Sequence, residues 1–386
     1  MSLKESIYKS LLKSINTKKA SLHEPVFSLL EKQYLQDCIE STFVSSEGIF
    51  LEKFKKKLIK FTGSKFVIPV SSGTSALHIS LISQNISYKD EVLVPALTFV
   101  ATANAVKYCR AIPNFIDCNE KTLGIDVEKL EYYLFENTRM REGKCINKKT
   151  GNHIKALIPM HTFGHPSEIE EILKISTKYN LTVIEDSAEA LGSFYKKKHL
   201  GTFGKLGVLS FNGNKIITTG GGGAILTKDK KLAKKITHLS TTAKNIHKWE
   251  YIHDEVGYNY RMPNLNAALG CAQMNKINIF LKSKRNLFKI YKDNFKNFEE
   301  LYLFEEPKYC SSNYWLQTLI LTETNAHQLD DILDYTNKKG LRTRPAWNLL
   351  SDLKPFKSSP KSNLDNSKSL RKRIINIPSS SFLPIT

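Results

Sequence analysis

Short apolar runs alternate with amphipathic segments between about residues 66 and 240 of this 386-residue chain. Apolar runs are typical of strands buried on both faces, and the segments between most of them have the apolar spacing of helices. This alternation predicts an α/β fold with a mostly parallel, mixed sheet flanked by helices. The predicted strands are 66–70, 91–95, 113–118, 154–160, 181–186, 206–211 and 223–227, and the predicted helices include 75–83, 127–135 and 168–179.

The pattern changes after residue 240. A polar, aromatic stretch runs to Met262, and Pro263 then introduces a helical region that continues past Lys282. The remainder combines a strand at 315–321, a polar helix at 327–338 and a segment rich in Ser, Lys and Pro at 354–370 that is typical of an exposed loop. We therefore predict two domains. Residues 1–262 form an N-terminal segment and a large domain, and residues 263–386 form an interdomain helix and a smaller C-terminal α+β domain.

Composition narrows the function classes. The net charge of +20 suggests nucleic-acid binding, but the lysines are spread along the chain without a nucleic-acid-binding motif, so we expect a solvated basic surface. The six cysteines form no CxxC pair, and Gly164 and Pro166 interrupt the helix that would align His161 with His165, so we expect no metal site. No signal peptide or membrane span is recognisable, which predicts a cytoplasmic protein.

A glycine turn follows the first predicted strand, in the order Ser72, Gly73, Thr74, Ser75. A strand that turns through glycine into a helix presents free backbone N–H groups and the positive end of the helix dipole, and Thr74 and Ser75 add hydroxyl donors. These are the donors of a phosphate-binding cup. On local sequence alone, an ordinary helix start capped by Ser72 or Thr74 explains the turn equally well.

Lys215 follows the predicted strand 206–211 and precedes four consecutive glycines at 220–223. A lone lysine is usually a surface residue, and a hairpin turn explains one or two glycines, but four in a row carry an entropic cost. A primary amine after a buried strand, near backbone without side chains, is suited to hold an aldehyde cofactor as a Schiff base. The aldehyde that fits is pyridoxal 5'-phosphate (PLP), and Ser210 is placed to bond its phosphate.

Asp186 closes the apolar strand 181–186. The carboxyl ends of strands form the ligand crevice of α/β sheets. A carboxylate there can keep the pyridine nitrogen of PLP protonated, which lets the ring accept electrons. Taken alone, Asp186 is more simply explained as a helix N-cap, and its position relative to Lys215 favours the cofactor role.

Together these residues resemble the sugar-nucleotide aminotransferases of the DegT/StrS type, within the fold type I PLP superfamily. The resemblance extends from about His23 to Asn348. Each motif is weak alone, but their order and spacing together are specific. The motifs are 45–48 (SSEG), 72–77 (SGTSAL), 90–92 (DEV), 99–102 (FVAT), 185–188 (EDSA), the block 210–223 and 257–262 (GYNYRM).

The resemblance implies roles for the matching residues. Lys215 would carry PLP and shuttle protons, Asp186 would pair with the pyridine nitrogen, and Phe99 would stack on the ring. The residues implied to hold the phosphate are Gly73, Thr74, Ser75 and Ser210, together with Asn259 of a neighbouring subunit. The resemblance therefore also implies a homodimer with shared active sites.

Contacts to the sugar-nucleotide substrate are implied less directly. Ser46, Arg342 and Arg344 are the candidates. For the two arginines, a surface salt bridge is an equal alternative.

Two positions depart from the usual pattern of the resembled family. Glu189, a predicted neighbour of the cofactor, stands where many relatives have Gln or His, and Gly221 replaces an acidic residue. With the segments 160–166 (MHTFGHP) and 210–215 (SFNGNK), they look most like the subgroup of the legionaminic acid and bacillosamine pathways. That subgroup implies transfer of an amino group from L-glutamate to C4 of a UDP- or GDP-linked 2-acetamido-2,6-dideoxy-4-keto-hexose. A perosamine-type or 3-keto-sugar aminotransferase is the alternative.

Two interpretations from other classes are weaker. A PLP-dependent sugar dehydratase on this scaffold would have histidine in place of Lys215. A PLP-sensing transcription regulator would need a winged-helix domain before the core, whereas the first predicted strand already begins at residue 66.

Overall fold

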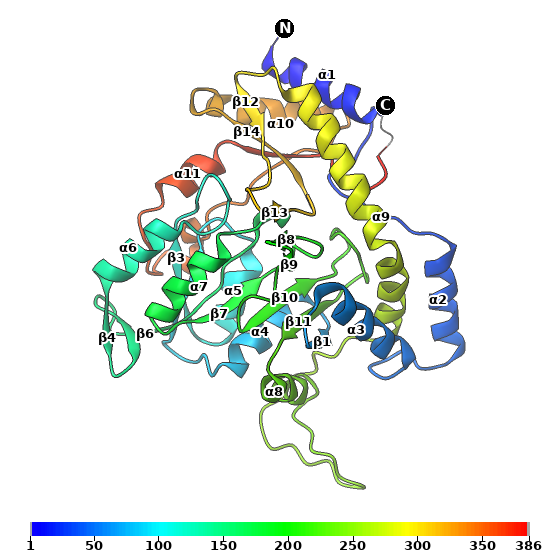
Figure 1. Ribbon diagram of the computed structural model, residues 1–386, viewed down its shortest axis with the longest axis vertical. Helices are drawn as coiled ribbons and strands as arrows, with labels where there is room; N and C mark the ends of the chain where they lie inside the picture. Colours follow the sequence, from blue (N-terminus) through cyan, green and yellow to red (C-terminus); the bar gives the residue numbers. More distant parts are fainter. Residues whose placement is uncertain (1, 384–386) are drawn as a thin grey trace.

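The computed structural model describes residues 2–383, and within them the central element is a nine-stranded sheet (Figure 1). Its main path runs β1-β11-β10-β7-β6-β2-β3, and the hairpin β4–β5 joins it beside β6. The path is parallel from β10 to β3, whereas β11 is antiparallel to both β1 and β10. The predicted mostly parallel, mixed sheet is confirmed. The strands are β1 (Phe66–Val70), β2 (Glu91–Pro95), β3 (Ile112–Ile116), β4 (Thr138–Arg141), β5 (Lys144–Asn147), β6 (His153–Leu157), β7 (Thr182–Asp186), β10 (Leu206–Ser210) and β11 (Gly223–Thr227).

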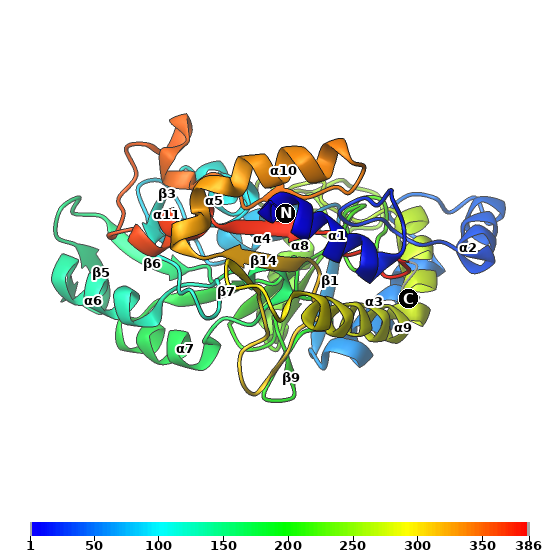
Figure 2. The ribbon, with the colours of Figure 1, turned by 90° about the horizontal axis from the view of Figure 1, so that it is seen from above.

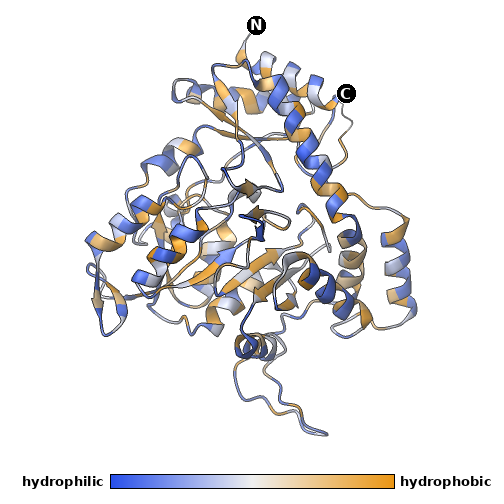
Figure 3. Cartoon of the chain, viewed as in Figure 1, coloured by the Kyte–Doolittle hydropathy of each residue, from blue (hydrophilic) through white to orange (hydrophobic). Residues whose placement is uncertain are grey.

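Alternate side chains of the strands enter hydrophobic clusters on opposite faces of the sheet. Val92 and Ile184 pack with one set of helices, whereas their neighbours Leu93 and Val183 pack with another. Figure 3 shows the apolar strands enclosed by helices with hydrophilic outer faces. The first face is covered by α4 (Gly73–Ser83), α5 (Val100–Tyr108) and α8 (Lys230–Ser240), and the second by α3 (Ile49–Thr62), α6 (Val127–Asn137), α7 (Ile169–Lys178) and the start of α9 (Asn264–Phe295).

The C-terminal part contains a four-stranded antiparallel sheet in the order β12-β14-β16-β15. Helix α1 (Leu3–Ile15) packs against α9 and α10 and shares a hydrophobic cluster with this sheet, so the chain start lies with the C-terminal part (Figure 2). The division at residue 262 stays a prediction. These elements are β12 (Leu301–Leu303), β14 (Gln317–Leu321), β15 (Arg344–Pro345), β16 (Ile374–Ile377) and α10 (Leu329–Lys338). A three-stranded sheet joins β13 (Cys310–Ser311), β8 (Phe194–Tyr195) and β9 (Lys198–His199).

The prediction of an exposed loop at 354–370 was wrong in its second half. Helix α11 (Asp365–Arg371) begins there, after a 3-10 turn at Lys354–Phe356. The buried carboxylate of Asp117 accepts hydrogen bonds from the backbone N–H groups of Asn366 (3.1 Å) and Ser367 (2.7 Å). The first turn is thus capped by a residue far away in sequence. Helix α2 (Leu29–Glu40) was not predicted. No described helix is long and apolar enough to cross a membrane.

Candidate active site

A cavity of about 350 Å³ lies at the carboxyl ends of β1, β7 and β10. Its lining contains seven of the predicted site residues, which are Gly73, Thr74, Phe99, Asp186, Glu189, Ser210 and Lys215. Parallel strands bring their carboxyl ends to one edge of a sheet, which is why segments far apart in sequence meet here. The structure therefore brings the glycine turn, the aspartate and the lysine to one place.

The glycine turn forms the start of α4. The Ser72 hydroxyl accepts a hydrogen bond from the Ser75 N–H (3.0 Å), and the Ser75 hydroxyl accepts one from the Ser72 N–H (2.9 Å). Ser75 is therefore occupied by the cap and does not line the cavity, whereas Gly73 and Thr74 do. The first N–H groups of a helix have no partner within it, so they are available to an anion. The capping interpretation and the phosphate-cup interpretation are compatible.

Glycine is required at two positions around this cup. A Cβ on Gly73 would lie 2.9 Å from the Cβ of Ser210, and a Cβ on Gly223 would lie 2.5 Å from the Ser72 carbonyl group. The missing side chains let β10 and β11 approach the start of α4. At Gly221, by contrast, a Cβ would meet nothing nearer than 3.9 Å.

Asp186 is buried at the end of β7. One carboxylate oxygen accepts a hydrogen bond from the Thr102 hydroxyl (2.7 Å), and the other accepts one from the Ala188 N–H (3.2 Å). Burial raises the pKa of the Asp186 carboxyl, and these bonds and the charge of Lys215 oppose the rise. The chain continues in a turn and not a helix, so the N-cap alternative does not explain this residue.

Lys215 contacts Glu189, one of the two residues that depart from the usual pattern of the resembled family. Its Nζ donates a hydrogen bond to Oε1 of Glu189 (3.1 Å) and lies 3.9 Å from the ring centroid of Trp315. The second carboxylate oxygen of Glu189 accepts a hydrogen bond from the Phe163 N–H (2.9 Å). Burial raises the pKa of Glu189, and the charge of Lys215 opposes that rise. The lysine thus sits between an acid and an aromatic face.

Besides Ser75, four predicted contacts lie outside this cavity. Asn259 is exposed, and Ser46 lines a separate hollow with Arg261. Arg342 lines another hollow, and Arg344 is exposed on the edge strand β15. Neither Arg342 nor Arg344 forms an ion pair with any described residue, so the surface salt bridge is not observed. Within one chain these four residues do not reach Lys215.

Sequence patterns missed several residues of the cavity wall. Met160, Trp315 and Trp347 line it, and Trp347 lies 6.3 Å from Phe99 between ring centroids. Both tryptophans come from the C-terminal part, and no local sequence pattern predicts that this part contacts the cavity. The Trp315 indole N–H donates to the Asn214 carbonyl (2.7 Å), which fixes the ring beside Lys215.

The donor set fits PLP. A primary amine suits the aldehyde, the start of α4 suits the phosphate, and a buried carboxylate suits a protonated ring nitrogen. Phe99 is half-exposed at the cavity and offers an aromatic face. The side chains of His161 and His165 have separate partners: His161 bonds Glu185 (3.1 Å), and His165 packs on Phe304 and Tyr314. No cluster of three or more potential metal ligands occurs within residues 2–383.

Known proteins resemble this chain in sequence. The model of the DegT/DnrJ/EryC1/StrS aminotransferase family matches residues 28–384. The chain is 37% identical over 326 residues to GDP-perosamine synthase of Escherichia coli O157:H7, covering 84% of each chain. It is 30% identical over 305 residues to the spore coat polysaccharide biosynthesis protein SpsC of Bacillus subtilis, covering 76% of this chain and 74% of SpsC.

Solved structures share the fold. A DegT DnrJ EryC1 StrS aminotransferase from Brucella abortus aligns with a TM-score of 0.84 at 23% identity, covering 92% of this chain and 91% of its own. Helicobacter pylori PseC, an aminotransferase involved in the biosynthesis of pseudoaminic acid, gives the same TM-score and identity with 93% of each chain covered. The expected aminotransferase fold is confirmed.

Proposed function

Because this chain belongs to the DegT/DnrJ/EryC1/StrS aminotransferase family, whose members depend on PLP, we propose that it transfers an amino group from L-glutamate to a nucleotide-linked keto sugar. The observation that carries the proposal is the convergence of Lys215, Asp186 and the start of α4 on one cavity. When bound, PLP supplies an electron-accepting ring and carries the amino group between the two substrates.

The residues of the cavity have distinct roles in this proposal. Lys215 holds the cofactor through its amine and moves protons at Cα of the amino donor and at the sugar carbon. Asp186 keeps the ring nitrogen protonated, and the N–H groups of Gly73 and Thr74 bind the phosphate with the Ser210 hydroxyl. Trp315 and the neighbouring aromatic side chains limit the access of water to the amine.

We propose C4 as the acceptor carbon and two candidate sugars. The motifs at 160–166 and 210–215 support a UDP- or GDP-linked 2-acetamido-2,6-dideoxy-4-keto-hexose of the legionaminic acid or bacillosamine type. The second candidate is a GDP-linked sugar of the perosamine type. It is supported by the GDP-perosamine synthases of Escherichia coli O157:H7 and Vibrio cholerae, which are 37% and 32% identical to this chain.

A substrate panel tests these proposals. The PLP-loaded protein is incubated with L-glutamate and each UDP- or GDP-linked 4-keto sugar, and both 2-oxoglutarate and the amino sugar are quantified. We expect stoichiometric formation of the two products with one sugar class. Lys215→Arg keeps a cation but should abolish both products. Absence of 2-oxoglutarate with every sugar would reject the proposed reaction.

We also propose a homodimer in which Asn259 of one subunit completes the site of the other. An arm at 244–256 projects from the body of the molecule, and several of its large apolar side chains are exposed (Figure 1). These are Ile246, Trp249, Tyr251, Ile252 and Val256. A surface of this kind is typical of an interaction site.

Subunit mixing tests the shared site. Lys215→Ala and Asn259→Ala proteins, each inactive alone, are dissociated and reassociated together. If each site uses both subunits, mixed dimers contain one intact site, and about a quarter of the wild-type activity should return. If activity stays at the level of the separate variants while mixed dimers form, Asn259 acts within its own subunit.

A further inference from the structure

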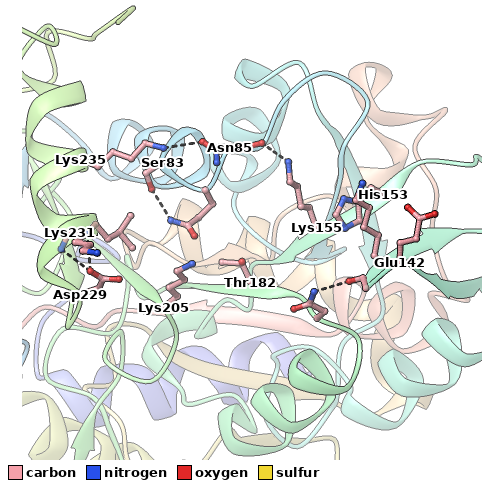
Figure 4. Close-up of a pocket in the computed structure, with 15 residues that line it drawn as sticks. Ser83, Asn85, Glu142, His153, Lys155, Thr182, Lys205, Asp229, Lys231 and Lys235 are labelled. Carbon is pink, nitrogen blue, oxygen red and sulfur yellow. Dashed lines mark hydrogen bonds between the residues drawn. The ribbon is translucent and has the colours of Figure 1, made fainter. Parts of the chain in front are cut away.

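A second hollow, of about 640 Å³, lies at the opposite edge of the large sheet (Figure 4). Thr182 begins β7 and Lys205 immediately precedes β10, and both line this hollow. Asp186 and Ser210 end the same two strands in the active-site cavity. Because a five-residue strand spans about 16 Å, the two sites are separated by the length of these strands. The hollow is therefore not an extension of the active site.

Cationic side chains dominate the lining of this hollow. Figure 4 shows Lys205, Lys231 and Lys235 on one side of the open space and Lys155 on the other, beside His153, whose pKa is lowered by burial. Lys144 adds a further cation from the start of β5. Such a convergence raises the positive potential over this open hollow, although Lys144, Lys205 and Lys231 are themselves exposed to solvent.

Most of these charges are not neutralised by neighbours. Lys155 pairs with Asp90 (3.0 Å), and Lys235 donates to the side-chain oxygen of Asn85 (2.9 Å). In contrast, Lys144, Lys205 and Lys231 form no ion pair with any described residue.

The acids of the lining do not offset this excess. Asp229 caps α8, and its Oδ1 accepts hydrogen bonds from the N–H groups of Lys231 (2.8 Å) and Leu232 (3.1 Å). Glu142 is exposed at the tip of the β4–β5 hairpin and lies 3.9 Å from Arg141. Three free lysines therefore face a hollow whose acids have other partners.

The rest of the wall is polar. Ser83, Gln84, Asn85, Asn180 and Thr182 contribute hydroxyl and amide groups. Leu232 is the only aliphatic side chain of the described lining, and the lining contains no Phe, Tyr or Trp. The first feature disfavours an apolar ligand, and the second removes the stacking surface that single-stranded nucleic acids use.

We propose that this hollow binds a small oligophosphate anion, either inorganic pyrophosphate or a nucleoside diphosphate. Adjacent phosphate groups carry several negative charges, which match the unpaired lysines, and their oxygens accept hydrogen bonds from the amides of the wall. The site is distinct from the active-site cavity, because none of its lining residues lines that cavity.

Calorimetric titration of the PLP-loaded, full-length protein tests the proposal with two matched variants. Lys205→Gln/Lys231→Gln removes two charges from the hollow, and Lys296→Gln/Lys338→Gln removes two exposed charges elsewhere. Wild-type protein should bind pyrophosphate saturably at moderate salt. The hollow variant should bind about tenfold more weakly, because two exposed ion pairs are lost, whereas the control variant should bind like wild type.

A parallel titration with GDP or UDP distinguishes the two candidate ligands, pyrophosphate and a nucleoside diphosphate. If GDP or UDP binds more tightly than pyrophosphate, and this binding is lost in the hollow variant, the ligand is a nucleoside diphosphate. If the nucleotide and pyrophosphate bind equally well, the site recognises the phosphate groups alone. Unchanged thermal midpoints and cofactor absorbance show that the variants are folded. Equal affinity of wild type and hollow variant, or no saturable binding of either anion, overturns the proposal.

Discussion

The contact between Lys215 and Glu189 predicts a non-additive pair of substitutions in the cofactor-free protein. The two charged groups lie 3.1 Å apart, and their side chains are only 12% and 2% exposed. Lys215→Met removes the cation and leaves a buried carboxylate whose remaining partner is the Phe163 N–H. Glu189→Gln removes the negative charge but keeps an oxygen that can accept that bond.

The expected coupling follows from this geometry. Opposite unit charges at this distance attract by about 5 kcal/mol at an effective dielectric constant near 20. The burial of both ions offsets much of this attraction, so we expect a net coupling energy of about 1–3 kcal/mol. Because burial raises the pKa of Glu189, the carboxylate is unfavourable once its cation is removed. Glu189→Gln should therefore restore most of the stability lost in Lys215→Met.

Urea unfolding of the wild type, both single variants and the double variant at neutral pH measures the coupling. The exposed pair of Lys178 and Glu131, 2.7 Å apart, is the control, and its cycle should give less than about 1 kcal/mol. The coupling requires an ionised Glu189, so it should be present above the raised pKa and disappear as the pH falls through it. This loss should begin above pH 4.5, the ordinary value for the group. Additive effects at neutral pH, or coupling that persists well below pH 4.5, would refute the reasoning.

Three further substitutions test the site and its support. Gly223→Ala places a Cβ 2.5 Å from the serine that caps α4, so PLP affinity measured by equilibrium dialysis should fall at least about tenfold, whereas Gly221→Ala should bind normally. Asp186→Asn keeps the shape but loses the charge, so kcat in the coupled 2-oxoglutarate assay should fall by about 100-fold while PLP still binds. Burial raises the pKa of Glu31, but hydrogen bonds from Lys276 of α9 and from Ser28 outweigh this effect and lower the pKa to about 2. Glu31→Gln should therefore reduce the unfolding free energy by about 2 kcal/mol at neutral pH, a difference that shrinks as the pH falls from 4.5 towards 2, and exposed Glu40→Gln should have no effect.

Much of the large sheet could be predicted because most of its strands are mainly apolar, and because polar residues mark the ends of the strands at the site: Ser71 follows β1, and β7 and β10 end in Asp186 and Ser210. The same strand ends placed Gly73, Asp186 and Lys215 correctly in one cavity. The wall formed by Trp315 and Trp347 could not be predicted in this way, because it depends on the C-terminal part returning to the large sheet. Local periodicity contains no information on such contacts.

The start of α11 and the packing of α1 illustrate the same limit. The cap of α11 comes from Asp117, and α1 is amphipathic without a sequence signal for the partner of its apolar face. In both cases a local segment is stabilised by residues hundreds of positions away, so its place in the fold follows only from the complete tertiary structure.

The two departures from the family pattern are connected through the cavity that both residues line. Gly221 has room for a side chain, so its lack of one is not imposed by packing. An acid there would add a third carboxylate to Asp186 and Glu189, whereas Lys215 is the only cation among the described lining residues. Like charges at short range in a buried site are unfavourable, and the end of the cavity near the start of α4 is where we propose that the phosphate binds. Glycine at 221 therefore keeps that end free of negative charge and leaves Glu189 as the one acid paired with the lysine.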